Sequence, residues 1–355
     1  MFVRTLSVAG LRNIREARLT LGSGSVLILG RNGAGKTTVL EAIYLLARGR
    51  SFRSHRSGDL TTVGAQETRI HSVIENQGLS MDWTFIRGGR NHGRWIDGVA
   101  VGQGAQHGVR LAVRLVGENA PQLLEADPAL RRRFLDWNLF HVEQGYGTAL
   151  ARYRVVLDQR NAWLKQGGRG RSVWDEEFIT SGELLDRLRC RGVAAIAAAF
   201  DRLTQEFDVL SGVTPTYLRG TPRDCSLADA LAADSEAEKA VGFTRVGPHR
   251  SDISLVRDGK PASLSRGQIK LAVCLMQLAC DAVEMECSHT RSIWLLDDLA
   301  CDLDDETADR LVSLFVGSEC QCIFTAIGTK PGRLFDRLPA SAPVFQASEG
   351  IIARV

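Results

Sequence analysis

The sequence lacks several features that would assign its class at once. None of its eight cysteines forms a CxxC pair, and no run of 18 apolar residues occurs in the 355-residue chain. The first absence argues against a zinc site built from paired cysteines, and the second against a membrane-spanning helix. Residues 1–5 also lack the apolar stretch and cleavage site of a signal peptide. We therefore expect a cytoplasmic protein with reduced thiols.

An excess of one charge is also missing. The chain has 44 Lys and Arg against 41 Asp and Glu, so its formal net charge is only +3. Whole-chain charge therefore does not indicate a nucleic-acid partner, and any such argument depends on local clusters. Apolar residues make up 44% of the chain, which allows a sizeable core. The length allows two domains, or one domain with a large insertion.

A phosphate-binding motif stands near the N-terminus. Val26 to Leu29 predict a buried strand, and apolar residues at helical spacing follow from Thr38 to Ala47. The segment between them is rich in glycine, which lets backbone N–H groups point at phosphate oxygens, and the following helix adds its N-terminal dipole. We expect this loop to bind ATP. The expected contacts are Gly30, Arg31, Asn32, Gly33, Ala34, Gly35, Lys36, Thr37 and Thr38.

Four side chains around this loop would carry the chemistry. Lys36 can supply positive charge to the β- and γ-phosphates, and the hydroxyl of Thr37 is placed to ligate magnesium. A second apolar strand, Ile293 to Leu296, ends in Asp297 and Asp298, at the strand edge where ligand sites of α/β sheets gather. We expect Asp297 to hold magnesium through water and Asp298 to be the general base. Taken alone, two acids at the end of a strand are better explained as a solvated turn or a helix cap, and only the glycine-rich loop upstream favours the magnesium site.

A third element precedes the acidic strand. Leu264 to Gln268 open an apolar helix, and a serine followed by a glycine at a helix N-terminus can bind an anion. An ordinary N-cap is the simpler interpretation. The order of the three elements resembles the ATP-binding-cassette class, in which the signature serine reaches the γ-phosphate of ATP bound in the other subunit. That resemblance implies an ATP-dependent homodimer with catalytic roles for Asp298, Lys36 and Ser265, and nucleotide contacts from Ser265, Gly267 and Gln268.

Further segments narrow the resemblance to the RecF family of the DNA-repair branch, which also includes SMC and zinc-hook heads. The matching segments are Gly30–Thr37 with Asn32, Leu40–Tyr44, Gly49–Arg53, Arg131–Asp136, Tyr153 with Gln159–Asn161, Gly247–Arg250, Leu264–Lys270 and Leu296–Ala300. The chain departs from the usual pattern at Thr38, Ser251 and Ile269. No histidine follows the predicted strand 322–325, so the H-loop of transporter ATPases is absent.

The RecF resemblance implies an ATP-dependent DNA clamp of recombinational gap repair. ATP would dimerise two heads on double-stranded DNA or at single/double-strand junctions, and slow magnesium-dependent hydrolysis would release them. The implied partners are RecR, RecO and, indirectly, RecA, in DNA replication, DNA repair and the SOS response. The alternatives are an SMC-like structural tether, a transporter-type ATPase subunit and a P-loop kinase. The insertion is too short for the long coiled coils of an SMC-like tether. The missing H-loop histidine argues against a transporter subunit, and the signature-like helix argues against a kinase.

The order of elements predicts an α/β fold, namely an ABC-type ATPase head with a mixed sheet, an antiparallel β-subdomain and an inserted helical arm. Strand-like patterns run from about residue 69 to 116, and helical patterns from about 128 to 212. Ile253 to Arg257 look like a further strand, with Asp258-Gly259 as a hairpin turn. The second long helix is expected to extend from Val193 through Phe207 to Leu210, at coiled-coil-like spacing. We place the discontinuous head at residues 1–120 and 242–355, and the helical insertion at 121–241.

Local arginine clusters suggest that DNA is bound. Segment 150–172 has six basic residues against one acid, and three more arginines flank glycines on a predicted hairpin. Such clusters suit phosphate contacts, which bind DNA without reading its sequence. For any single arginine, a solvated and salt-bridged surface is an equally good interpretation. The candidates for DNA contact are Arg87, Arg90, Arg94, Arg152, Arg154, Arg169 and Arg171.

Overall fold

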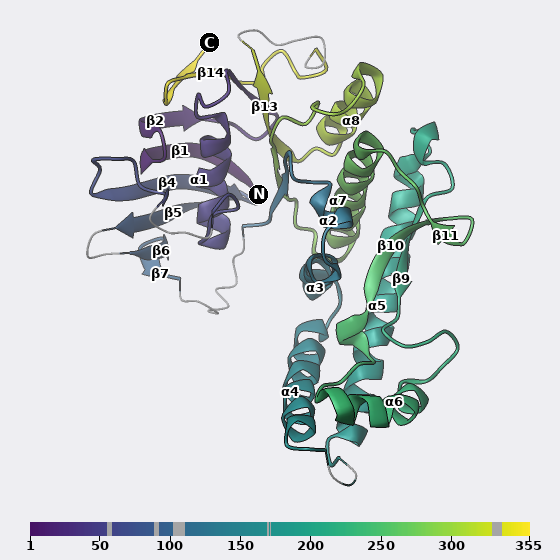
Figure 1. Cartoon of the computed structure of the whole chain (residues 1–355). Helices are drawn as coiled ribbons and strands as arrows, with labels where there is room; N and C mark the ends of the chain where they lie inside the picture. The colour runs from purple at the N-terminus through teal and green to yellow at the C-terminus, as the bar shows by residue number, and fades with distance from the viewer. Residues whose placement is uncertain (55–58, 89–91, 102–110, 169, 171, 329–335) are drawn as a thin grey trace. The chain divides into compact units, whose positions relative to one another are not determined.

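The structure is a computed structural model that describes the whole chain except residues 55–58, 89–91, 102–110, 169, 171 and 329–335 (Figure 1). The chain forms two compact units. The first unit comprises Met1–Ala120 and Thr290–Val355, and the second comprises Pro121–His289. The chain leaves the first unit after Ala120 and returns at Thr290, whereas the sequence pattern predicts a return at residue 242.

The first unit contains an antiparallel sheet with strand order β2-β1-β4-β5-β6-β7. Buried and exposed residues alternate along much of β2 and β4, as expected for a sheet with one face on a core. The strands are β1 (Phe2–Leu11), β2 (Ile14–Thr20), β4 (Glu67–Asn76), β5 (Leu79–Gly88), β6 (Gly93–Ile96) and β7 (Val99–Ala100). This sheet is the antiparallel β-subdomain that the sequence predicts.

A second sheet of the first unit has the order β15-β14-β3-β13-β12-β8, and its pairs are parallel except for the β15 edge. Every residue of β3 and β12 is buried, which explains their uninterrupted apolar sequences. The strands are β3 (Val26–Gly30), β8 (Val113–Val116), β12 (Ile293–Leu296), β13 (Gln321–Ile327), β14 (Val344–Ser348) and β15 (Ile351–Arg354).

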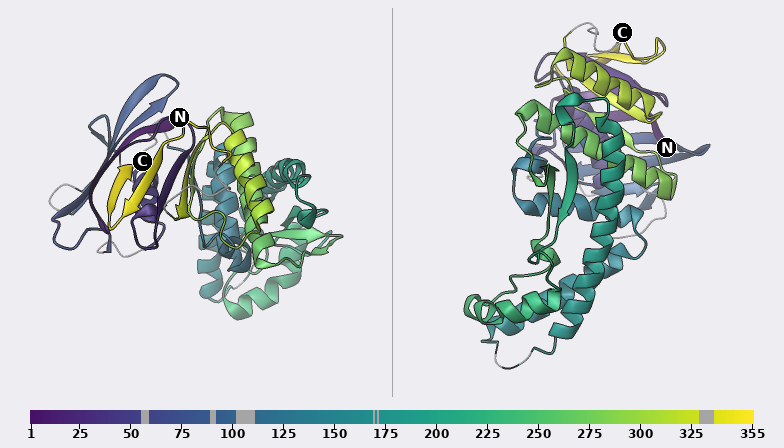
Figure 2. Two further views of the ribbon diagram at one scale, coloured as in Figure 1. Left: turned by 90° about the horizontal axis from the view of Figure 1, so that it is seen from above. Right: turned by 90° about the vertical axis from the view of Figure 1, so that its right-hand side faces the viewer.

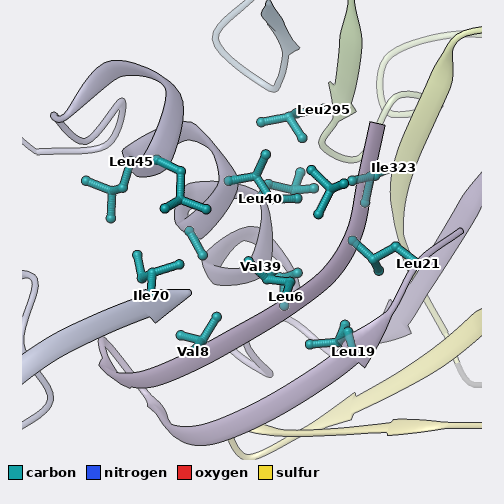
Figure 3. Packing of buried hydrophobic residues seen from close by; sticks show 14 of the residues in the cluster. Leu6, Val8, Leu19, Leu21, Val39, Leu40, Leu45, Ile70, Leu295 and Ile323 are labelled. Atoms are coloured by element: carbon teal, nitrogen blue, oxygen red, sulfur yellow. The ribbon is translucent and has the colours of Figure 1, made fainter. Parts of the chain in front are cut away.

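Helix α1 (Lys36–Arg48) packs on strands of both sheets, including β1, β5, β3 and β13. Apolar side chains from α1 and from both sheets form one buried cluster. Figure 3 shows Leu6 and Val8 of β1, Leu40 of α1, Leu295 of β12 and Ile323 of β13 within this cluster. Since α1 starts at the glycine-rich loop, this packing fixes the helix whose N-terminus faces the predicted phosphate site. Helix α8 (Asp305–Gly317) packs on β12 through a Trp294–Phe315 ring contact.

The second unit is built around α5 (Asp175–Thr204), which packs against α4, α7 and β9 (Figures 1 and 2). Its other helices are α2 (Gln122–Glu125), α3 (Pro128–Val142), α4 (Tyr146–Lys165), α6 (Leu227–Val241), α7 (Arg266–Ser288) and the 3-10 turns η2 (Asp208–Leu210) and η3 (Pro248–Arg250). A small antiparallel sheet joins β9 (Thr214–Leu218), β10 (Asp252–Arg257) and β11 (Lys260–Pro261). Because α7 packs on α5 and α3, residues 242–289 lie in this unit.

Two expectations for this unit can be compared with the structure. The predicted Asp258-Gly259 hairpin turn is confirmed, with positive φ at both residues (51° and 74°). The predicted extension of the second helix to Leu210 is wrong, because α5 ends at Thr204. Phe207 and Leu210 are still buried, just before and at the end of the 3-10 segment η2, so their helix-like spacing reflects burial and not a continuous helix. No helix in the described ranges is long and apolar enough to cross a membrane.

Candidate functional site

The glycine-rich loop predicted to bind ATP connects β3 to α1 in the first unit. Gly33 and Gly35 have positive φ angles of 77° and 113°, which glycine adopts without strain. Gly30 is required for another reason, because a Cβ atom there would lie 2.5 Å from the Ala347 carbonyl oxygen. The loop thus has the strand–loop–helix setting that a phosphate-binding loop needs.

Lys36, the expected phosphate-binding cation, is folded back onto this loop. Its ammonium donates to the carbonyl oxygens of Gly30 (3.0 Å) and Arg31 (3.2 Å), and the residue is only 4% exposed. An ammonium has three donors and no acceptor. A phosphate can therefore replace these carbonyls as its partner without leaving the buried charge unpaired. Arg31 and Asn32, by contrast, are exposed.

Two more carbonyls of the loop are held by distant parts of the chain. The Asn13 side-chain amide, in the β1–β2 turn, donates to the Gly33 carbonyl oxygen (2.9 Å), and the Gly350 backbone N–H, in the β14–β15 turn, donates to that of Ala34 (3.0 Å). We call these two contacts the P-loop clamp. In a trans peptide the C=O and the following N–H point in opposite directions. Fixing the Ala34 carbonyl therefore fixes the direction of the Gly35 N–H.

The β1–β2 turn that carries Asn13 is itself fixed to α1. Arg12, with a φ of 53°, makes a bidentate ion pair with Glu41 of α1 (3.0 and 2.8 Å), and Glu41 is fully buried. The hydrogen bond to Glu41 raises the pKa of the Arg12 guanidinium. The Thr38 hydroxyl donates to Asn13 Oδ1 (3.2 Å). Thr38, which the sequence predicts to contact the nucleotide, therefore uses its hydroxyl to hold the clamp residue Asn13. A Cβ at Gly350 would lie 2.0 Å from the Asn13 carbonyl oxygen, which explains the glycine.

Replacing Asn13 with alanine should weaken ATP binding about fivefold, because one lost hydrogen bond in the clamp corresponds to roughly 1 kcal/mol. Asn13→Asp should weaken binding further. It keeps the acceptor for Thr38 but turns a negative charge toward the Gly33 carbonyl and the phosphate site. Titration of the purified protein with a fluorescent ATP analogue measures both effects.

The matched control for Asn13 is Glu16→Gln, a change at an exposed residue of β2 just beyond the same turn. It should leave ATP affinity unchanged, and thermal unfolding without nucleotide separates loss of binding from loss of fold. If Asn13→Ala binds ATP as tightly as the unaltered chain does, then Gly350 alone holds the loop.

The two acids after β12 are joined by a threonine of the neighbouring strand β13. The Thr325 hydroxyl donates to Asp297 Oδ1 (2.7 Å) and accepts from the backbone N–H of Asp298 (3.0 Å). The Thr37 hydroxyl, from the glycine-rich loop, donates to the same Asp297 oxygen (3.1 Å). Asp298 has a φ of 45°, in the sparsely populated left-handed region that aspartate and asparagine tolerate and that is common at functional sites. The structure therefore brings Thr37, Asp297 and Asp298 together.

This arrangement fits the magnesium ion that the sequence predicts. Magnesium prefers octahedral oxygen ligands at about 2.1 Å, so neighbouring ligand oxygens lie about 3 Å apart. Thr37 Oγ1 and Asp297 Oδ1 lie 3.1 Å apart, so both are close enough to serve one magnesium ion, Thr37 as a direct ligand and Asp297 directly or, as the sequence predicts, through water. Magnesium in enzymes is also commonly held by one or two carboxylates together with substrate phosphates. In the described part of the chain, no cluster of three or more His, Cys, Asp or Glu is suited to hold a metal.

Sequence reasoning missed Thr325 and the clamp residues Asn13 and Gly350. The sequence does contain a signal for Thr325, which is a polar residue after the apolar run 322–324. Because the carboxyl ends of parallel strands share one sheet edge, such a residue is expected beside Asp297 and Asp298. For Asn13 and Gly350 no local signal exists. An asparagine and a glycine in turns are ordinary, and their partners lie far away along the chain.

The serine–glycine helix start is an N-cap with a capping box. Ser265 Oγ accepts from the Gln268 backbone N–H (3.3 Å), and the Gln268 side chain accepts from the Ser265 N–H (2.9 Å). Ser265 is exposed, and Gly267 and Gln268 are partly exposed. The structure therefore agrees with the ordinary N-cap that the sequence suggests. Because these residues stay exposed, the helix end is still accessible to an anion. These three residues belong to the second unit, while Lys36 and Asp298 belong to the first.

The predicted hairpin arginines have different environments. Arg94 donates to the carbonyl oxygens of Leu46 and Ala47 at the end of α1 (3.2 and 2.8 Å), and burial lowers the pKa of its guanidinium. Arg94 therefore uses part of its guanidinium to cap a helix, although the residue stays partly exposed. Arg87, on β5, is partly exposed. Arg90 lies outside the described residues.

The arginines of α4 are mostly committed to ion pairs. Arg152 pairs with Glu177 of α5, and Arg154 pairs with Asp136 of α3 (3.1 Å), although both arginines stay largely exposed. A DNA phosphate would therefore have to share them with carboxylates. Arg169 and Arg171 lie outside the described residues, so only part of this cluster can be placed.

Comparison with known sequences agrees with these features. The model of the RecF/RecN/SMC N-terminal domain matches residues 2–338. The chain is 34% identical to the DNA replication and repair protein RecF of Stutzerimonas stutzeri, over 92% of this chain and 90% of that protein. It is 33% identical to RecF of Azotobacter vinelandii, over 100% of this chain and 99% of that protein.

Solved structures show the same fold at lower sequence identity. The recombination mediator protein RecF with ATP superposes with a TM-score of 0.80 at 21% identity, covering 100% of this chain and 97% of that one. An SMC head domain of Pyrococcus furiosus superposes with a TM-score of 0.57 at 16% identity, covering 100% of this chain and 96% of that one. The predicted ABC-type head fold is thus confirmed. From its sequence relatives, the chain belongs to the RecF family of DNA replication and repair proteins.

Proposed function

We propose that this chain is an ATP-dependent DNA clamp that dimerises around shared ATP and opens on hydrolysis. The observation that supports it is the chain of contacts from Thr37 through Asp297 and Thr325 to Asp298. In this proposal one unit supplies the phosphate loop, the residues that would hold magnesium and the base. The exposed helix start at Ser265 lies in the other unit, where a second copy can use it.

Each residue then has one task. Lys36 moves from the loop carbonyls onto the β- and γ-phosphates, and the P-loop clamp keeps the Gly35 amide directed at them. Thr37 and Asp297 would hold magnesium, which neutralises phosphate charge when bound. Thr325 orients both acids, so that Asp298 accepts the proton of the attacking water. We expect slow hydrolysis, used as a release step rather than for turnover.

The proposed homodimer predicts a trans contact from Ser265. Ser265→Asp preserves the N-cap, because aspartate caps helices as well as serine, but it places a negative charge where the γ-phosphate of the other copy would bind. The ATP-dependent dimer should weaken at least about tenfold, since like charges facing each other across an interface cost several kcal/mol. Sedimentation velocity with ATP and magnesium, in an Asp298→Asn background that blocks turnover, measures the dimer.

Ser263→Asp is the control for this variant, because it adds the same charge at an exposed position two residues earlier. It should dimerise normally. If Ser265→Asp also dimerises normally, Ser265 is only an N-cap and the shared-site model fails. If the unaltered chain stays monomeric with ATP and magnesium, the clamp mechanism itself loses its basis.

We further propose that the clamp holds double-stranded DNA or single/double-strand junctions through phosphate contacts. Candidate contacts among the described residues are Arg87, Arg152 and Arg154. Such binding carries no sequence readout and weakens steeply with salt. By family membership, the partners would be RecR and RecO, with RecA loaded at gaps. The related structures bear on this proposal because their protein is described as a recombination mediator of the RecFOR pathway.

A further inference from the structure

The loop that follows α6, residues 242–250, is held in place by buried polar groups. Gly242 ends the helix with a positive φ of 75° and donates to the Glu238 carbonyl oxygen. Thr244 is 1% exposed, and both its N–H and its hydroxyl donate to Asn161 Oδ1 (2.8 Å each). The N–H of Arg245 donates to Glu238 Oε1 (2.8 Å). The backbone just after Phe243 is therefore fixed.

A buried arginine of α4 ties this loop to two other helices. Arg160 donates to the Thr244 hydroxyl (2.7 Å), and it pairs with Asp175 of α5 (2.9 Å) and Glu238 of α6 (2.8 Å). The Arg160 and Glu238 side chains are 4% and 0% exposed. A buried ion pair with several hydrogen bonds tolerates little displacement, because breaking it leaves a charge unpaired.

The far end of the loop is held by a neutral histidine. His249 Nε2 donates to the Thr244 carbonyl oxygen (2.9 Å), and its Nδ1 accepts from the Tyr153 hydroxyl (2.8 Å). Burial lowers the pKa of His249 to about 4, so it is neutral at physiological pH. Gly247 has a φ of 123° and lies so close to Tyr153 that a Cβ atom would be 2.9 Å from its hydroxyl oxygen. Both ends of the loop are thus rigid.

This rigid loop presents an aromatic ring to solvent. Phe243 is 41% exposed, and the Arg250 guanidinium lies over its ring, 5.6 Å from the centroid. A single exposed hydrophobic residue is ordinary on a protein surface. Phe243 differs from such a residue because its neighbours in the loop are fixed by buried polar groups, among them Glu238 and Thr244, and because a cation stacks on it.

Two basic residues lie at the two ends of this loop. Lys165, at the end of α4, lies beside Gly242, where a Cβ atom would be 3.9 Å from the Lys165 Cα and Cγ atoms. Among the described residues, neither Lys165 nor Arg250 has a carboxylate within 4.0 Å. Arg245, by contrast, is paired with Asp234 (3.4 Å). The surface therefore combines one accessible ring with two cations that have no carboxylate partner in the described structure.

We propose that Phe243 and Arg250 form a stacking site for an unpaired base of single-stranded nucleic acid. An aromatic face bordered by cations is the arrangement that binds single strands without sequence preference, since every base has a π-face. Bases inside a duplex are already stacked, so the site is available only to single strands and to the unpaired side of a junction. The proposal rests on the proposed DNA-clamp function and adds to it a means of recognising gaps.

Replacing Phe243 with alanine should weaken binding to gapped DNA about tenfold, the loss expected when one stacked base loses its ring. Affinity for a blunt duplex of equal length should not change. Phe243→Tyr should restore gapped-DNA binding, because it retains the ring. Phe243→Leu should not, because it retains only the apolar area. Fluorescence anisotropy at one fixed salt concentration measures all four proteins, with Val241→Ala, at an exposed neighbour, as the matched control.

A second readout reports stacking directly. A 2-aminopurine base in the single-stranded part of the gap should be quenched by the unaltered chain and by Phe243→Tyr, but not by Phe243→Leu. If Phe243→Ala and the unaltered chain bind gapped DNA with equal affinity, the stacking site is overturned. A protein partner would then be the remaining explanation of this surface. Failure of every protein to bind the duplex would instead count against the DNA clamp itself, so the two failures are distinguishable.

Discussion

Replacing Asp298 with asparagine should slow ATP hydrolysis at least about 100-fold, the usual contribution of a general base, while ATP binding persists. Asp298 lies next to the Thr37–Asp297 pair, and its backbone N–H is held by Thr325. Asparagine tolerates the positive φ of 45° found here. The substitution therefore removes the carboxylate without straining the turn. Single-turnover hydrolysis with ATP and magnesium measures the effect.

The same substitution should prolong the ATP-bound dimer, because release would depend on hydrolysis. Asp305→Asn, at an exposed acid of the first turn of α8, is the matched control and should hydrolyse ATP normally. Hydrolysis by Asp298→Asn within about threefold of normal would exclude Asp298 as the base. Water would then have to be activated by another group of the site or by the second copy.

Replacing Lys36 with methionine should weaken ATP binding at least about 100-fold, because hydrogen bonds to charged groups contribute about 1.5–3 kcal/mol each and every 1.4 kcal/mol is tenfold in affinity. Methionine keeps much of the apolar stem that packs in this buried position. The substitution removes only the ammonium. In the structure this group donates to the carbonyl oxygens of Gly30 and Arg31, and in the ATP complex it would donate to the phosphates instead. Isothermal titration calorimetry with ATP and magnesium gives the affinity.

The control for Lys36→Met is thermal unfolding with and without ATP. A ligand that binds only the folded state raises the unfolding temperature. ATP should therefore stabilise the unaltered chain but not the variant. If the variant unfolds normally without ATP and still binds ATP with unchanged affinity, the assignment of Lys36 is wrong.

Sequence predicts the glycine-rich loop and the acid-ended strand well, because each is a contiguous pattern whose chemistry depends on neighbouring residues. Burial of β3 and β12 on both faces gives uninterrupted apolar runs that are easy to recognise. The same holds for the Asp258-Gly259 turn, where the backbone demands positive φ.

Sequence predicts less where an interaction joins distant segments. Thr325 orients the two acids only because β13 pairs in parallel with β12. Arg94 resembles a surface cation until the end of α1 is placed beside it. Phe207 and Leu210 continue a helical spacing because both are buried, although α5 has already ended. In each case tertiary contacts, which local patterns do not encode, decide the role.

The P-loop clamp has a consequence for the order in which the protein matures. The loop leaves the ribosome early, together with Asn13, but Gly350 in the β14–β15 turn is synthesised long afterwards. β14 also supplies the edge that pairs with β3 beside the loop. Contacts between such distant segments form late in folding. A nascent chain would therefore hold the loop only by its Asn13 side, and a competent ATP site would arise only once β14 and β15 have been made.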